Sequence, residues 1–132
     1  MKLFIHTDGG ARGNPGPGAI GVAVLDEKKK VIKEIGKYIG KSTNNEAEYK
    51  AVLEGLRAAK ELKGSEIVFY IDSLLVVSQL NGKFKVKEPR MKNFFNEIKI
   101  VEKNFESVKY NHIPREKNYI ADKIVNEVLD TI

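Results

Sequence analysis

The chain is organised around a stretch near its N-terminus, Leu3-Phe4-Ile5-His6-Thr7-Asp8-Gly9-Gly10. Apolar residues occupy both sets of alternating positions in its first half, which is typical of a strand buried on both faces of a helix-covered sheet. One acid and two glycines follow. We therefore predict a central strand that ends at Asp8, with Gly9 and Gly10 leaving that point open to close approach by a ligand.

A second apolar strand, Ile67 to Ile71, ends in the same way, in Asp72-Ser73. In open α/β sheets, ligands bind in a crevice at the carboxyl ends of the strands. Two buried strands that each deliver a carboxylate at that end therefore predict a binding crevice at the edge of the sheet.

Composition narrows the class of protein. We expect the 132 residues to form a single domain over 1–132. The absence of cysteine excludes disulfides and thiolate chemistry. Without a long apolar run or a signal-type N-terminus, the chain is expected to be cytoplasmic and to have no membrane partner. A net charge of +5 favours a polyanionic partner.

The order of predicted elements indicates an α/β fold. Residues 9–18 form a turn-rich loop, and three strands joined by short turns make an antiparallel meander. The remaining elements alternate between helices and strands. The predicted strands after the first are 19–25, 31–39, 67–71 and 107–113, and the predicted helices are 44–62, 73–80, 91–105 and 119–129.

The first predicted helix carries an unusual acid. Thr43 and Glu46 form a capping box at its start, and Gly64 follows its end. Glu46 lies on a charged stripe, and we assign it to the cap. Glu48 lies on the apolar stripe, facing the core, where it can point at the carboxylates that end the strands.

Four acids are candidates to converge: Asp8, Glu48, Asp72 and Asp122. Four uncompensated carboxylates in a crevice would repel one another strongly. Hard divalent cations relieve that repulsion, and oxygen-only ligands suit Mg²⁺ or Mn²⁺. Two ions about 4 Å apart can activate a water and stabilise the leaving oxygen of a phosphodiester. The residues therefore predict metal-dependent phosphodiester hydrolysis.

Three of these acids also have an ordinary structural interpretation, whereas Glu48 on a core face is harder to explain in that way. Asp8 is compatible with an Asx turn, Asp72 with the N-cap of the next helix, and Asp122 with a first-turn acid that complements the helix dipole. His6 is interpreted as a packed strand residue. His112 is either functional or a surface histidine at a strand end.

The densest basic run is Lys83–Lys92, in which apolar residues are interleaved. It is either a binding surface for nucleic acid or a solvated edge.

Several motifs together resemble type 1 ribonuclease H in order and spacing. They are Thr7-Asp8-Gly9-Gly10, Gly13-Asn14-Pro15-Gly16-Pro17-Gly18, Thr43-Asn44-Asn45-Glu46-Ala47-Glu48-Tyr49, Tyr70-Ile71-Asp72-Ser73 and Ala121-Asp122. The resemblance covers essentially the whole chain. It implies a ribonuclease H-like α/β fold whose five-stranded mixed sheet, three antiparallel strands and then two parallel ones, is flanked by helices.

The resemblance also implies an activity, which is endonucleolytic cleavage of the RNA strand of RNA–DNA hybrids to 5′-phosphate and 3′-hydroxyl ends. By position, the family's metal-binding carboxylates match Asp8, Glu48, Asp72 and Asp122. His112 matches a mobile histidine that aids proton transfer or product release. The implied cofactors are two Mg²⁺ or Mn²⁺ ions.

The implied contacts with the hybrid follow from the same motifs. Asn14, Asn44 and Asn45 match positions that touch the minor groove and sugars, and Thr43 matches a phosphate contact on the DNA strand. Further predicted nucleic-acid contacts are Gly9, Gly10, Ser73, Lys83, Lys85, Lys87 and Asn118. A minor-groove reader can sense 2′-hydroxyls on one strand, so binding is expected to be salt-sensitive and independent of sequence.

The chain departs from many bacterial members in having no Trp and only a short basic segment after the third motif, and Leu74 follows Asp72-Ser73 where a polar residue is common. Two other functions stay open: a non-catalytic nucleic-acid-binding module of this fold, or a nuclease of this fold that acts on another duplex. We expect a monomer with no obligate protein partner.

Overall fold

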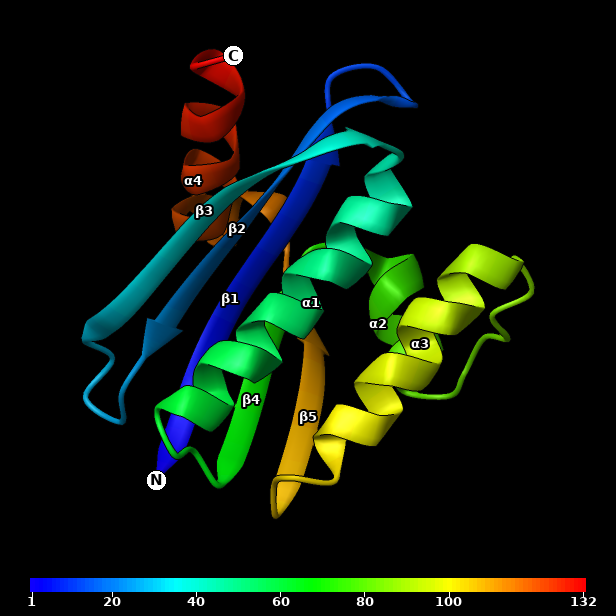
Figure 1. Cartoon of the computed structure of the whole chain (residues 1–132). Coiled ribbons are helices and arrows are strands. Elements are labelled where there is room, and N and C mark those ends of the chain that lie inside the picture. Colours follow the sequence, from blue (N-terminus) through cyan, green and yellow to red (C-terminus); the bar gives the residue numbers. More distant parts are fainter.

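The computed structural model describes residues 1–132 and contains one five-stranded sheet. The strands lie in the order β3-β2-β1-β4-β5, with β1 at the centre (Figure 1). The first three are antiparallel neighbours, and β4 and β5 run parallel to β1. This arrangement confirms the predicted mixed sheet. The strand bounds are β1 Lys2–Ala11, β2 Gly16–Leu25, β3 Val31–Ser42, β4 Glu66–Ile71 and β5 Ser107–His112.

Helices cover both faces of the sheet. The long helix α1 crosses one face in front of β1, with α2 and α3 beside it, and α4 lies on the opposite face behind β2 and β3 (Figure 1). No helix combines the length and the apolar character that crossing a bilayer requires. The helical bounds are α1 Asn44–Glu61, α2 Leu74–Leu80, α3 Pro89–Glu102, the 3-10 turn η1 Arg115–Lys117 and α4 Tyr119–Asp130.

The main core lies between the sheet and α1. Leu3 and Ile5 of β1 pack there with Tyr49 and Val52 of α1 and Phe69 of β4, all fully buried. The opposite face of β1 is only partly covered, because α4 lies mainly over β2. The prediction that β1 is buried on both faces is therefore only half correct. The neighbouring strand β2 is instead buried throughout its second half.

The turn-rich loop is shorter than predicted. Gly10 pairs with Ala19 and Ala11 pairs with Gly18, so the antiparallel ladder of β1 and β2 continues past the acid. The connecting loop contains residues 12–15 rather than 9–18. Asp8 therefore lies inside the central strand, three residues before its end.

The start of α1 confirms Thr43 as its N-cap, since the Thr43 hydroxyl accepts a hydrogen bond from the Glu46 backbone N–H at 3.2 Å. Glu46 reaches back to the cap as predicted, since its Oε1 accepts a hydrogen bond from the Thr43 hydroxyl at 3.2 Å. Its side chain is nevertheless buried rather than exposed on a charged stripe, and its carboxylate binds the Arg90 guanidinium at 2.7 Å. Lys63, rather than Gly64, takes the left-handed conformation after the helix.

Helix α3 begins and ends earlier than predicted. The Glu88 carboxylate accepts hydrogen bonds from the backbone N–H groups of Arg90 and Met91 and so caps the helix. Pro89 occupies the first helical position, which its fixed φ angle suits.

Candidate active site

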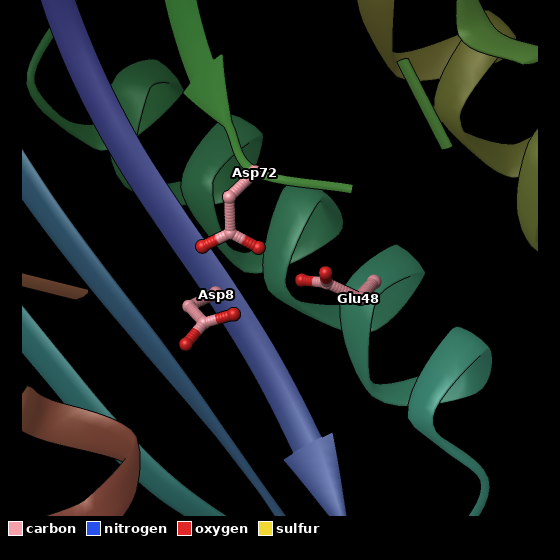
Figure 2. A group of neighbouring side chains, drawn as sticks. All are labelled: Asp8, Glu48 and Asp72. Carbon is pink, nitrogen blue, oxygen red and sulfur yellow. The ribbon is translucent and has the colours of Figure 1, made fainter. Parts of the chain in front are cut away.

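Three of the four predicted carboxylates meet above the centre of the sheet. Asp8 comes from β1, Glu48 from the first turns of α1, and Asp72 from the residue after β4, and their carboxylates point toward one another (Figure 2). One oxygen from each lies within 4.8 Å of the others. Asp8 and Glu48 are buried, at 8% and 7% exposure. These three residues form the acidic triad.

The backbone fixes the two aspartates side by side. Strands β1 and β4 are parallel, and Thr7 pairs with Ile71, so the next residue of each chain segment is an aspartate at the same height. Ser73 is the N-cap of α2, because its hydroxyl accepts a hydrogen bond from the Val76 N–H at 3.3 Å. The capping interpretation of Asp72 is therefore wrong, and its carboxylate belongs to the crevice.

Glu48 reaches the aspartates because α1 packs directly on the backbone of β1. A Cβ at Gly9 would lie 2.2 Å from the carbonyl carbon of Ala47, so only glycine permits this contact. The Gly9 N–H then donates a hydrogen bond to Glu48 Oε1 at 2.8 Å. The predicted open space at Gly9 is thus filled by the helix, whereas the space beside Gly10 remains.

The triad carries unbalanced negative charge. Burial, and then the charges of Asp72 and Asp122, raise the pKa of Asp8 to about 7. Burial also raises the pKa of Glu48, as do the neighbouring Asp8 and Asp72. No cationic side chain forms an ion pair with any of the three. A cluster of buried oxygens without a counter-charge fits a hard divalent cation.

Asp122 lines the same cleft, of about 430 Å³, from the first turn of α4. Its two oxygens lie 3.4 Å from Arg115 Nη2 and 3.3 Å from Asn126 Nδ2. The fourth acid is therefore at the cleft but outside the acidic triad.

Comparison with known proteins identifies the family of this chain. A family described as reverse transcriptase-like matches residues 6–128. The ribonuclease H of Thermoanaerobacter pseudethanolicus is 32% identical over 139 residues, which cover 93% of this chain and 86% of that protein. The chain belongs to the type 1 ribonuclease H family.

Solved structures of ribonucleases H superpose closely on the chain. The ribonuclease H1 of Halobacterium salinarum has a TM-score of 0.97 and 33% identity, with full coverage of both chains. LC11-RNase H1, solved with an RNA/DNA hybrid, has a TM-score of 0.93 and 42% identity over 98% of this chain and 97% of that one. A bifunctional protein of Mycobacterium tuberculosis is 37% identical over 98% of the chain, which spans only 36% of that relative's length.

The predicted histidine of this ribonuclease H family member lies on β5, beside the strand whose end carries Asp72. His112 is exposed at the end of β5, where it pairs with Ile71, and it is not among the residues that line the cleft. The cleft is instead lined by Arg115, whose guanidinium lowers the pKa of Asp8 slightly against the larger effects of burial and charge. Sequence reasoning missed Arg115, because nothing in its neighbourhood distinguishes it from the other exposed basic residues.

The structure contradicts the predicted contact of Asn118 with nucleic acid. Asn118 is fully buried, and its amide nitrogen donates to Thr7 O at 2.9 Å and to Asp72 Oδ2 at 3.1 Å. It therefore supports the acidic triad from below.

The residues predicted to touch the minor groove, and Thr43, the predicted phosphate contact, lie beside the acidic cleft. Asn14, Thr43, Asn44 and Asn45 line a second cleft of about 600 Å³, and Asn44 lines both. Asn14 Oδ1 accepts from the Asn44 backbone N–H at 3.0 Å, and Asn44 Oδ1 accepts from the Ala11 N–H at 2.8 Å. These two bonds join the β1–β2 loop to the start of α1.

The predicted lysine contacts form an exposed segment between α2 and α3. Lys83, Lys85 and Lys87 are exposed, as is Phe84, whereas Val86 packs against the core. The three lysines therefore face solvent, and Val86, but not Phe84, anchors the segment to the core.

Proposed function

We propose that this chain is a divalent-metal-dependent endoribonuclease that cleaves the RNA strand of RNA–DNA hybrids, leaving 5′-phosphate and 3′-hydroxyl ends. The observation that carries the proposal is the acidic triad, which has two buried members and no cationic partner and is set in an open cleft. Its similarity to LC11-RNase H1, which was solved with an RNA/DNA hybrid, supports this choice of substrate.

The residues that would hold the metal are Asp8, Glu48 and Asp72, with Asp122 at the edge of the same cleft. Bound Mg²⁺ or Mn²⁺, as a two-ion site, supplies an activated water and stabilises the leaving oxygen. The chain itself holds the ligands in place: the Gly9 N–H fixes Glu48 at 2.8 Å. The mobile-histidine role of His112 stays a prediction.

The asparagines suit recognition of a minor groove. The side-chain oxygens of Asn14 and Asn44 accept hydrogen bonds inside the protein, so their amide N–H groups are the part left for a ligand. Minor-groove base edges present acceptors in every base pair, and a ribose 2′-hydroxyl can also accept. Recognition by these donors would therefore depend on the sugar and groove rather than on base sequence.

The direct test is a substrate panel with labelled RNA–DNA hybrid, duplex RNA and duplex DNA, each with Mg²⁺, Mn²⁺ or chelator. We expect metal-dependent cleavage of the hybrid's RNA strand, with 3′ ends that a polymerase can extend, and none by Asp72→Asn. Absence of RNA cleavage with either metal at any salt, or full activity in Asp72→Asn, would refute the proposal. Binding without turnover would instead support the non-catalytic module, and cleavage of duplex DNA the nuclease for another duplex.

Arg115 is expected to act on the substrate rather than on the metal. Its guanidinium is 79% exposed and lies at the mouth of the acidic cleft, where it can meet a phosphate. Arg115→Ala should lower kcat/KM about tenfold, the scale of one charged hydrogen bond. Because a positive charge is removed, Mn²⁺ affinity should stay equal or rise. Arg115→Lys serves as the control that keeps the charge but loses the planar fork. A fall in Mn²⁺ affinity would contradict this role.

The exposed lysine segment is expected to bind the nucleic-acid backbone. Replacing Lys83, Lys85 and Lys87 together by Gln should weaken hybrid binding about tenfold. The slope of log K against log[salt] should become shallower by about 2, because each phosphate contact releases roughly one counterion. Fluorescence anisotropy between low and moderate salt measures both quantities.

The matched control removes the same number of exposed lysines at the opposite end of the molecule. Lys28 and Lys30 lie in the β2–β3 turn and Lys60 near the end of α1 (Figure 1). Replacing these three lysines by Gln should lower the affinity for hybrid only slightly, because it lowers the net positive charge of the protein without removing a contact. Equal losses in the two triple variants would show that the segment is a solvated edge.

A further inference from the structure

Asn118 connects three of the segments that carry the predicted metal ligands. Its side-chain nitrogen bonds Thr7 O, next to Asp8, and Asp72 Oδ2. Its backbone carbonyl accepts from the Asp122 N–H at 3.1 Å. The remaining side-chain atom, Oδ1, lies 3.0 Å from His6 Nδ1. The residue is fully buried, whereas its partners His6 and Asp72 are half-buried.

The chemistry of these partners fixes the orientation of the Asn118 amide. A peptide carbonyl and a carboxylate oxygen can only accept, so the group that faces Thr7 and Asp72 must be the NH₂, which has two protons to give. The amide oxygen therefore faces His6. A flipped amide would place an oxygen against two other oxygens and remove the Asn118 donor from Thr7 O and Asp72 Oδ2.

The same reasoning fixes the tautomer of His6. Since Asn118 Oδ1 can only accept, Nδ1 of His6 must carry a proton. This holds whether the ring is neutral or charged, because the imidazolium is protonated at Nδ1 as well. The ring is also held by stacking on Tyr70 of the neighbouring strand, with centroids 5.0 Å apart.

We propose that His6 and Asn118 form a positioning pair for the acidic triad, in which the His6 Nδ1–H orients the Asn118 amide and the amide holds Asp72 Oδ2. The proposal rests on the proposed function, since its purpose is to hold a metal ligand. Neither side chain lines the cleft, so both act through Asp72. This adds a hydrogen-bonding role to the packing of His6 against Tyr70, and it replaces the predicted contact of Asn118 with nucleic acid.

The first test reads the tautomer in the wild-type protein without metal or substrate. Long-range ¹H–¹⁵N correlation spectra of the histidine rings distinguish the Nδ1–H form from the Nε2–H form. We expect His6 in the Nδ1–H form, with slow exchange of that proton. An Nε2–H tautomer would overturn the proposal, and this result is independent of whether the chain cleaves hybrids.

The second test uses three variants that separate the donor from the ring. His6→Phe keeps an aromatic ring for stacking and removes the donor. His6→Asn places an N–H two bonds from Cβ, the position of Nδ1. Asn118→Ala removes both the acceptor for His6 and the donor to Asp72. Loss of an outer partner of a metal ligand typically costs 10–100-fold in metal affinity or activity.

We therefore expect His6→Phe to weaken Mn²⁺ binding about tenfold, measured by electron paramagnetic resonance or calorimetry without substrate. Its kcat should fall by a similar factor with the KM for hybrid unchanged, and Asn118→Ala should show the larger loss. His6→Asn should lie within about threefold of wild type in both quantities. Wild-type Mn²⁺ affinity in His6→Phe, or a change confined to the KM for hybrid, would refute the pair. If the chain cleaves no hybrid, Mn²⁺ affinity alone still decides.

Discussion

Asp8→Asn is expected to abolish hybrid cleavage and, in the metal-free protein, to increase the free energy of unfolding. Activity should fall by about three orders of magnitude or more, as for other residues that act as a unit in catalysis. Stability should rise because the variant removes one of three mutually repelling carboxylates that lie within 4.8 Å. Loss of activity combined with a gain of stability is the expected mark of a site built for a bound cation.

The size of the stability gain follows from the pKa of Asp8, which burial and then the charges of Asp72 and Asp122 raise from 3.8 to about 7. Each pKa unit corresponds to about 1.4 kcal/mol between the two protonation states, so the ionised form destabilises the fold by about 4 kcal/mol at most. We expect Asp8→Asn to recover about 2 kcal/mol or more at about pH 8.

The pH dependence has a definite sign. Between about pH 4 and pH 7, folded Asp8 keeps a proton that the unfolded chain has lost, so stability falls as pH rises through this range. Below this range both states are protonated, and above it both are ionised. Urea unfolding in the presence of a chelator should therefore show that the free energy of unfolding of the wild type declines over this pH range. The decline should be smaller in Asp8→Asn.

Glu27→Gln is the control, because Glu27 is exposed in the β2–β3 turn and forms no ion pair. It should leave both the stability and its slope with pH unchanged. Added Mn²⁺ should stabilise the wild type more at high pH than at low pH, since the metal competes with protons. An Asp8→Asn protein no more stable than wild type at high pH in chelator would contradict the electrostatic account.

Much of the fold followed from local patterns and motif order. Strand periodicity and turn residues located the elements, and the motifs supplied the order of the sheet. The choice of Glu48 over Glu46 followed from the face of α1 that each occupies, because Glu48 shares a stripe with core residues such as Val52.

The remaining features depend on partners distant in sequence. Glu46 is buried because Arg90, 44 residues later, covers it. Asn118 faces inward because its amide hydrogen-bonds with His6, which lies more than a hundred residues earlier in the sequence. A residue's position on its own helix or loop does not reveal such partners. The same limit explains why Arg115 was missed.

Gly9→Ala is expected to destabilise the protein strongly, although it adds only one methyl group. The new Cβ would lie 2.2 Å from the carbonyl carbon of Ala47 and 2.5 Å from the Glu48 nitrogen, both backbone atoms that cannot rotate away. Helix α1 would have to move off the sheet, which would break the Gly9 N–H bond to Glu48. Overpacking of this kind costs about 3 kcal/mol or more.

Gly10→Ala is the matched control, because a Cβ there meets nothing closer than 3.8 Å, the Val125 side chain. Its stability should change by less than about 1 kcal/mol. Urea unfolding of both variants, with Mn²⁺ titrations of the folded proteins, separates two explanations of the glycine pair. If the pair serves only to admit a ligand, the two variants should weaken Mn²⁺ binding alike and leave stability intact. If Gly9 instead admits α1, only Gly9→Ala should lose both stability and Mn²⁺ affinity, because the helix that must move carries Glu48.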